Sequence, residues 1–504
     1  MSDQRSSDSE FAGTDGRDHN AGITPRRGAS RRAFLKAGLG IAAGGTAAPA
    51  LTGTGLAQDA GNLELAQLQR QRRILIKGGA VLTLDRQVGD FAKADILIED
   101  GKIREIRPDI AASGDVAVVD ATNRIAIPGF IDTHSHSYQG VLRSIMPNGV
   151  LVPDYNRDVQ AALTPAFTPA DVYAGVLMSA LGYIDMGTTA IVDLSQISHT
   201  PEHSDACVRA LLDSGIRAVY GYSRGLGPQT QYPQDIHRLQ RTYFSSKDQL
   251  LTLELNGVLD PKVFAVAREI GVPAILHLVA SDTSGPFLEL GRAGLLRPGD
   301  EYIHCLNLTP EAWRLIKDSG GNVSICAAID MTMGHGTPAI QEALDLGLRP
   351  SLSSDHGVAI AQDFFSVMRQ TFTFQRLQVF SRARAGERNL PPLLTCRDML
   401  EFATVAGARC ANLDHKVGTL TPGKDADILL LRADDPSLWP VNNAPGTVVN
   451  MMNPGHVEAV FIAGKVRKWR GSLVGIDWPR VKRLAEEARD AVMRRAGFSV
   501  DFLA

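Results

Sequence analysis

Residues 128–136 read PGFIDTHSH, an apolar run that ends in two histidines separated by one residue. Alternate side chains of a β-strand point to the same face, so His134 and His136 project together from the end of this strand. Two imidazoles side by side can hold one divalent metal ion. In parallel α/β barrels the active site lies at the carboxyl ends of the strands, which is the end that this pair would occupy.

Three later apolar runs end in residues of the same chemistry. AILH ends in His277, EYIH ends in His304 and PSLSSD ends in Asp355. Any one of them could be an ordinary polar residue at a strand end, but a repeated coincidence at separate strand ends is hard to sustain. We expect one metal ion to be held by three neutral nitrogens and one carboxylate, with room for water, from His134, His136, His277 and Asp355.

The rest of the chain has the sequence pattern of an α/β protein. From 129 to 416 short apolar β-type runs alternate with helical stretches, and alternation over roughly 250 residues is what a (β/α)₈ TIM barrel needs. Strand-like runs and tight hairpins occupy 73–128 and 417–475, which predicts a small β-sandwich domain built from both ends. A helix with mixed charges is expected at 479–497. Between residues 142 and 168 we expect a loop or short helices over the barrel mouth, which could form a lid.

Composition excludes several classes of protein. Hydrophobic residues make up 44% of the 504-residue chain, which suits a globular enzyme with a sizeable core. The 52 basic and 55 acidic residues nearly balance, so there is no charge pattern for nucleic-acid binding. The five cysteines are scattered without a CxxC pair, which argues against a disulfide framework or a structural zinc knot.

The N-terminus reads as a targeting segment. Residues 1–29 are polar, SRRAFLK follows at 30–36, and an Ala/Gly-rich apolar run extends to about residue 57. This pattern is typical of a secretory signal, and the SRRxFLK form resembles the twin-arginine signal of bacteria. We therefore expect a disordered leader plus signal over 1–57, export by the twin-arginine machinery, and a periplasmic or secreted mature protein. A membrane anchor is the alternative, but Gly, Ala and Thr insert weakly, so no stable membrane association is expected.

These motifs, together with SSDHG at 353–357 and VGTLTPGKDAD at 417–427, resemble the amidohydrolase superfamily over about 73–475. The similarity is to its cytosine deaminase-like and chlorohydrolase-like branch. The resemblance implies the split β domain, a small-molecule substrate, a possible homo-oligomer and one metal ion, usually zinc or iron, on the four positions named above. Manganese tolerates the same ligands. Dinuclear branches carry a carbamylated lysine near 190–193, where this chain has none, which favours a single metal.

The resemblance also suggests catalytic roles. The position of His304 faces the substrate in that branch, where it can hydrogen-bond the attacked oxygen or hold the hydroxide in line. A divalent metal lowers the pKa of water, and Asp355 can take the water's proton and pass it to the leaving group. Asp355 and His304 are therefore the predicted catalytic residues.

The chain departs from the branch at one important position. Many of its deaminases carry a glutamate three residues after the third metal histidine, and this chain has Ala280 there, with Asp282 nearby. The segment 323–336 resembles a substrate-facing loop, so Asp330 and His335 are candidates, with His304, for substrate contact. His356 is expected to point to the opposite face if the strand continues past Asp355.

Three functions remain open at this point. The first is hydrolysis of a carbon–nitrogen, non-peptide bond in a small amide, carbamate or heterocyclic substrate, which the loss of the glutamate favours. The second is hydrolytic deamination of an aminated heterocycle. The third is a catalytically inactive, metal-containing binding protein, against which the presence of both His304 and Asp355 argues.

Overall fold

The computed structural model describes residues 63–246, 248–279 and 283–503. The predicted leader and twin-arginine signal lie outside the described residues, as do Ala280 and Asp282. The chain separates into a unit up to Gln58 and a second unit from Asp59 onward, and the description below concerns the second unit. Within the described ranges, no helix combines the length and apolarity needed to cross a bilayer.

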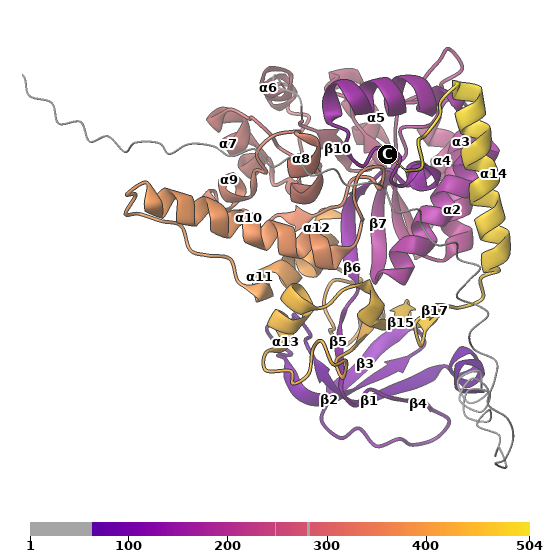
Figure 1. Cartoon of the computed structure of the whole chain (residues 1–504), viewed down its shortest axis with the longest axis vertical. Coiled ribbons are helices and arrows are strands. Elements are labelled where there is room, and N and C mark those ends of the chain that lie inside the picture. Colours follow the sequence, from indigo (N-terminus) through magenta and orange to yellow (C-terminus); the bar gives the residue numbers. More distant parts are fainter. Residues whose placement is uncertain (1–62, 247, 280–282, 504) are drawn as a thin grey trace, which may run out of the picture. The chain divides into compact units, whose positions relative to one another are not determined.

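Eight parallel strands form a nearly closed barrel, which confirms the predicted fold (Figure 1). In chain order, which is also their order around the barrel, they are β6 (Phe130–Ser135), β7 (Thr188–Leu194), β8 (Arg217–Tyr222), β9 (Leu251–Asn256), β10 (Ala274–His277), β11 (Glu301–Ile303), β12 (Asn322–Ile325) and β13 (Ser351–Leu352). The last and first strands meet through a parallel bridge between Ser135 and Asp355. Thr133 reinforces the closure, because its hydroxyl lies 2.8 Å from that of Ser351.

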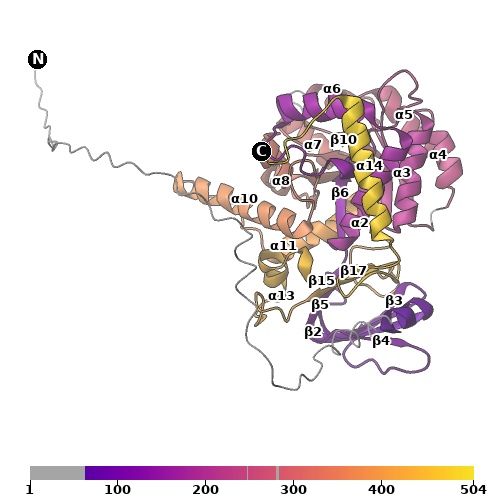
Figure 2. The same cartoon turned by 45° about the vertical axis from the view of Figure 1, so that its right-hand side comes forward.

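Helices surround the barrel. They are α2 (Pro169–Asp185), α3 (Pro201–Ser214), α4 (Ile236–Tyr243), α5 (Pro261–Ile270), α6 (Ser284–Arg292), α7 (Pro310–Ser319), α8 (Ala327–Met333), α9 (Ile340–Asp345), α10 (Phe364–Arg384), α11 (Cys396–Glu401) and α12 (Gly407–Cys410). Three of them, α3, α5 and α7, start with proline and end at a glycine in the left-handed region, the arrangement that best satisfies helix ends. The final helix, α14 (Trp478–Ala496), packs along α2 (Figure 2).

A separate mixed sheet is built from two segments far apart in sequence, 73–128 and 428–473. Its order is β17-β16-β15-β14-β5-β1-β2-β3, with β4 paired to β1. The strands are β1 (Arg73–Val81), β2 (Phe91–Glu99), β3 (Lys102–Arg107), β4 (Ala117–Asp120), β5 (Arg124–Pro128), β14 (Ile428–Arg432), β15 (Val457–Ile462), β16 (Lys465–Trp469) and β17 (Ser472–Leu473). Side chains from both halves, such as Ile96 and Phe461, share one hydrophobic cluster. The chain also contains shorter helical segments: η1 (Ser137–Leu142), η2 (Leu151–Leu163), η3 (Thr164–Ala166), η4 (Phe402–Ala406), α13 (Ala444–Gly446), η5 (Thr447–Met451) and η6 (Pro454–His456).

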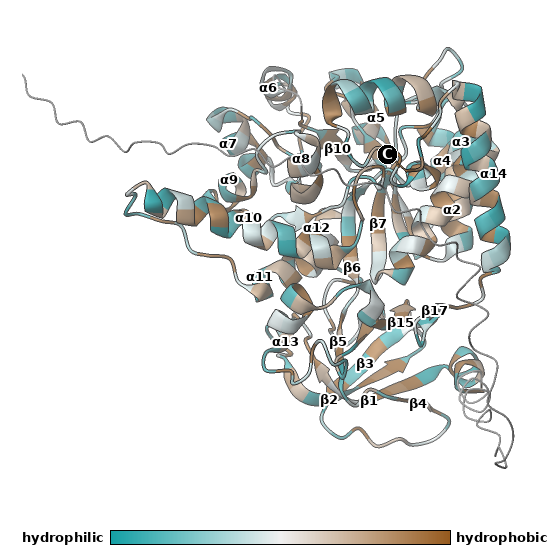
Figure 3. Ribbon diagram, in the orientation of Figure 1, coloured by the Kyte–Doolittle hydropathy of each residue, from teal (hydrophilic) through white to brown (hydrophobic). Residues whose placement is uncertain are grey.

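The mixed sheet joins the amino ends of the barrel strands. β5 ends one residue before β6 begins, and Arg217, the first residue of β8, crosses the junction. Its guanidinium donates to both carboxylate oxygens of Asp427 at 2.9 Å and to Asp425 at 3.0 Å, and only 1% of the side chain is exposed. The KDAD motif therefore ends in two carboxylates that hold the barrel to the sheet. In Figure 3 apolar residues run along the barrel strand β7, whereas polar residues are frequent on outer helices such as α10 and α14.

Candidate active site

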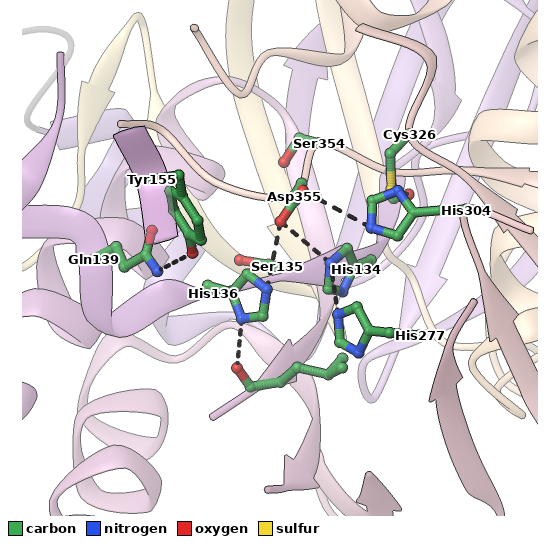
Figure 4. A network of polar contacts seen from close by, with 12 residues as sticks. His134, Ser135, His136, Gln139, Tyr155, His277, His304, Cys326, Ser354 and Asp355 are labelled. Carbon is green, nitrogen blue, oxygen red and sulfur yellow. Dashed lines mark hydrogen bonds and ion pairs between the residues drawn. The ribbon is translucent and has the colours of Figure 1, made fainter. Parts of the chain in front are cut away.

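The four predicted metal ligands meet at the carboxyl ends of the barrel strands. Figure 4 shows His134, His136, His277 and Asp355 pointing toward one another. The Nε2 atom of His134 lies 3.3 Å from Nε2 of His277 and 3.2 Å from Oδ1 of Asp355. The same carboxylate oxygen lies 3.4 Å from Nε2 of His136. Residues from three strand ends, far apart in sequence, thus converge on one point.

These spacings fit a tetrahedral cation. Zinc binds imidazole nitrogen at about 2.0–2.1 Å in a tetrahedral shell, so its ligand atoms are about 3.3–3.4 Å apart. The two distances from Nε2 of His134, 3.3 Å to Nε2 of His277 and 3.2 Å to Oδ1 of Asp355, lie close to that edge length. Nitrogen and carboxylate donors also suit iron and manganese. The donor set therefore fits one divalent metal ion.

The protonation states of the three histidines and of Asp355 also suit metal binding. Burial lowers the pKa of His134 to about 3 and also lowers the pKa values of His136 and His277, so these imidazoles are neutral, as metal ligands must be. The Nδ1–H of His136 donates to the carbonyl of Leu194 at 3.0 Å, which leaves Nε2 free to face the cluster. Although burial raises the pKa of Asp355, the surrounding histidines hold it well below its usual value.

Backbone geometry holds Asp355 between the two histidines of β6. Its φ is 64°, in the left-handed region that is uncommon for residues other than glycine. Its amide donates to the carbonyl of His134, and its carbonyl accepts from the amide of His136, both at 2.9 Å. His304 has a φ of 63°. Unusual backbone conformations that the surrounding fold maintains are concentrated at functional sites.

The sequence analysis did not identify Asp132 as part of this arrangement. Its carboxylate accepts from the amide of His134 at 3.2 Å, from the amide of Ser354 at 3.1 Å and from the Ser354 hydroxyl. It thereby joins β6 to the segment that carries Asp355. Burial raises the pKa of Asp132 to about 7. A sequence signal existed, because Asp132, His134 and His136 alternate along the strand with the period of two that places side chains on one face.

His304 belongs to a second buried group. Its Nδ1 lies 2.8 Å from Oδ1 of Asp330, and Nδ1 of His335 lies 3.2 Å from the same oxygen. Burial lowers the pKa of His304, but the Asp330 carboxylate more than offsets this and the net shift is upward. Asp330 is fully buried and does not line the cavity. It contacts the two histidines instead, so the expected direct substrate contact does not follow from its position.

A cavity of about 450 Å³ opens onto this cluster. Five of the predicted residues line it: His136, His277, His304, His335 and Asp355. Leu151, Tyr155, Asn156 and Gln160 of η2 also line it, so the segment predicted as short helices forms one of its walls. Further lining residues that sequence reasoning missed include Gln196, Arg224 and Asn256, which lie at or beyond the ends of β7, β8 and β9. The loop residues among them carried no periodic pattern.

The prediction for His356 was wrong. It lines the same cavity as Asp355, and its ring stacks on that of Tyr155 with a centroid distance of 4.7 Å and an angle of 9°. The reason is that β13 ends at Leu352 and Asp355 adopts a left-handed conformation, so strand alternation does not continue. His199 and His203 do not line the cavity. Their Nε2 atoms contact the carbonyls of Thr164 and Phe167 at 3.0 and 3.1 Å, where they hold the chain that follows η2.

Residues 125–467 match the model of the amidohydrolase family. The chain belongs to the amidohydrolase family. This amidohydrolase is therefore an enzyme of the class that hydrolyses carbon–nitrogen bonds other than peptide bonds, on the barrel and mixed sheet described above.

The alignments with two curated relatives extend over nearly the whole length of each relative. The amidohydrolase is 27% identical over 429 residues to a 5-methylthioadenosine/S-adenosylhomocysteine deaminase from Caldicellulosiruptor saccharolyticus, covering 80% of this chain and 95% of the relative. It is 26% identical over 445 residues to a 5'-deoxyadenosine deaminase from Methanosarcina mazei, covering 84% of this chain and 99% of the relative. Both relatives are named as deaminases of adenosine derivatives.

Two solved structures share the fold. A zinc-bound adenosine deaminase from Xanthomonas campestris superposes with a TM-score of 0.74 at 18% identity, covering 84% of this chain and 98% of that protein. An atrazine chlorohydrolase from Arthrobacter aurescens, complexed with zinc, gives a TM-score of 0.72 at 21% identity, covering 82% of this chain and all of that protein. Both hold zinc, and the described residues of this amidohydrolase include a candidate site of three histidines.

Proposed function

We propose that this amidohydrolase is a metal-dependent hydrolase that cleaves a carbon–nitrogen bond of a small amide, carbamate or heterocyclic substrate. One observation carries the proposal: three neutral histidine side chains and one carboxylate converge beside a cavity large enough for a small molecule. His134, His136, His277 and Asp355 would hold one divalent ion, with zinc as the first candidate because of the donor set.

The chain's own groups supply the proton transfers. When bound, a divalent cation supplies Lewis acidity there, which brings the pKa of water toward neutrality. Asp355 accepts the proton of the attacking water and passes it to the leaving nitrogen. His304, which Asp330 orients through Nδ1, presents Nε2 toward the reacting centre and hydrogen-bonds the oxygen that gains negative charge.

A second candidate is hydrolytic deamination of an aminated heterocycle. The relatives named as deaminases of adenosine derivatives favour it. Against it stands Ala280, at the position where many such enzymes carry a glutamate. His335 lines the cavity beside His304 and is the group placed to move a proton to a ring nitrogen in the absence of that glutamate.

A substrate panel separates these reactions. The full chain is purified, and metal content is measured by elemental analysis for the wild type beside His134→Ala/His136→Ala. Ammonia release is measured with adenosine, 5'-deoxyadenosine, 5'-methylthioadenosine and aminated triazines. Ring opening of cyclic amides and hydrolysis of carbamates are followed by mass spectrometry. Turnover that disappears in the double variant and returns to the stripped wild type on adding zinc, iron or manganese supports the proposal. Bound metal without turnover on any class would favour a binding protein.

We also propose export of this enzyme by the twin-arginine pathway to the periplasm or beyond. The SRRAFLK motif at 30–36 supports it. Replacing both Arg31 and Arg32 by lysine should leave the protein inside the cell, as measured by fractionation beside the wild type. Equal export of the variant would contradict the proposal. We further propose a homo-oligomer, which light scattering on the purified chain tests.

A further inference from the structure

The side chain of Asp330 controls two imidazoles at once. Its Oδ1 atom lies 2.8 Å from Nδ1 of His304 and 3.2 Å from Nδ1 of His335. A carboxylate that accepts the Nδ1–H of a histidine turns Nε2 outward, where it carries a proton in the charged imidazolium and a lone pair for a cation in the neutral imidazole. Local geometry makes this possible, because α8 ends at Gly334 in the left-handed region and the amide of His335 donates back to the carbonyl of Asp330 at 3.0 Å.

The free nitrogen of His335 has no partner in the described part of the chain. Only 3% of its side chain is exposed, and its Nε2 atom is buried without a hydrogen bond. A buried polar atom without a partner costs about 1–3 kcal/mol, so its persistence calls for an explanation such as a ligand. His335 lines the cavity next to His304, with ring centroids 5.5 Å apart.

Asp355 completes a donor set. Ligand atoms of His304, His335 and Asp355 lie within 4.8 Å of one another. The two carboxylate oxygens of Asp355 face different partners: Oδ1 is directed to His134 and His136, whereas Oδ2 lies 3.9 Å from Nε2 of His304. One carboxylate can therefore bridge two neighbouring cation positions.

We propose that His304, His335 and Asp355 form a second divalent-cation site beside the first, with Asp330 as the carboxylate that orients both histidines. This site differs from one built on a carbamylated lysine, because two of its three ligands and their orienting carboxylate come from β11 and the α8 segment. The charges are compatible, since Asp330 and Asp355 offset part of the added positive charge.

Filling this site should inhibit the enzyme, a consequence that rests on the proposed function. In that function His304 hydrogen-bonds the reacting oxygen, and a cation bound to its Nε2 would remove this contact. Activity should therefore rise with the first equivalent of Zn²⁺ and fall at higher Zn²⁺ concentration. The His335→Gln variant should lose most of the fall at high Zn²⁺, with activity expressed relative to the variant's own maximum, because the substitution removes a ligand of the second site.

Metal binding itself tests the proposal without any substrate. The metal-stripped full chain is titrated with Zn²⁺ by calorimetry and with Co²⁺ by visible absorption. We expect two equivalents per wild-type chain, one in His335→Gln, and at least a tenfold weaker second site in Asp330→Asn. His415→Gln, which alters an exposed histidine, is the matched control and should retain two equivalents. Circular dichroism and thermal melting confirm that each variant is folded.

Each outcome bears on a different claim. A wild-type chain that saturates at one equivalent, or a folded His335→Gln variant that still binds two, overturns the second site and leaves the proposed hydrolase intact. A chain that binds no cation overturns both. If one equivalent binds and Asp330→Asn slows turnover, then Asp330 and His335 act on the substrate and not on a metal.

Discussion

The buried polar groups at the two ends of the barrel differ in how completely they are paired. At the amino end, the guanidinium of Arg217 donates to Asp425 and Asp427, and every partner is of opposite charge. At the carboxyl end, buried histidines face one another and the carboxylates of Asp355 and Asp330, and among the described residues Nδ1 of His134 and Nε2 of His335 have no hydrogen-bond partner. A buried polar cluster that is complete within the chain joins parts of the fold, whereas an incomplete one that borders a cavity has atoms free to bind a ligand.

The largest effect should come from Asp355, at the incomplete end. Asp355→Asn keeps the shape of the side chain but removes the carboxylate that moves the proton and helps hold the cation. We expect kcat/KM to fall by about 10³-fold or more with little change in thermal stability. Steady-state kinetics on the best substrate of the panel measures this, with the exposed Asp318→Asn as control. Activity within tenfold of the wild type would end the catalytic assignment.

At the complete end, Arg217→Met should affect stability and leave the chemistry alone. The substitution leaves the buried Asp427 without its partner, which typically costs about 3–5 kcal/mol. Urea unfolding measures the loss in the free energy of unfolding, provided that its dependence on urea concentration is the same in both proteins. The kcat, measured well below the melting temperature, should stay near the wild-type value. Arg382→Met breaks the exposed pair with Glu387 and should leave the stability close to that of the wild type, because water screens surface ion pairs. Equal losses in the two variants would contradict the contrast.

Glu254, a buried carboxyl of β9, allows the stability cost of an incompletely paired group to be measured as a function of pH. One oxygen accepts from Nδ2 of Asn412 at 3.0 Å, and the other has no partner within the described part of the chain. Burial raises the pKa of this carboxyl to about 8. Because the folded pKa is raised, the stabilising contribution of Glu254 is full below about pH 4.5 and is lost as the pH rises toward 8.

Glu254→Gln removes this dependence, since an amide cannot ionise. Its stability relative to the wild type should increase by about 3 kcal/mol between pH 5 and pH 8. Chemical unfolding at several pH values measures the difference, with the exposed Glu269→Gln as control. A difference that stays constant across this range would show that Glu254 has an ordinary pKa.

The smallest expected effect concerns the cavity wall formed by η2. Tyr155→Leu removes the ring that stacks on His356, an interaction of about 0.5–1.5 kcal/mol. We expect kcat/KM to fall by about threefold to tenfold, mainly through KM. Tyr155→Phe keeps the ring and loses only the hydroxyl contacts with Gln139 and Gln160, so it should lie closer to the wild type. If Tyr155→Phe is the more damaging change, the hydroxyl and not the stack matters.

Strand periodicity was sufficient to predict the barrel and the residues that meet in it. His134 and His136 follow from alternation along one strand, and the remaining residues follow from the rule that parallel strands place their carboxyl ends together. The split sheet was predictable because hairpin patterns occurred at both ends of the chain. These patterns involve residues that are close together in the chain, so they can be recognised in the sequence.

What the sequence by itself determined is therefore the barrel, the mixed sheet and the residue types at the strand ends. Only the tertiary structure decided that Asp330 contacts two histidines and not the cavity, that His356 turns into the cavity, and that Arg217 meets the KDAD motif. The physical reason is that these contacts depend on left-handed backbone turns at Asp355 and Gly334 and on pairings across up to 210 residues of chain. Neither feature leaves a periodic pattern in the sequence.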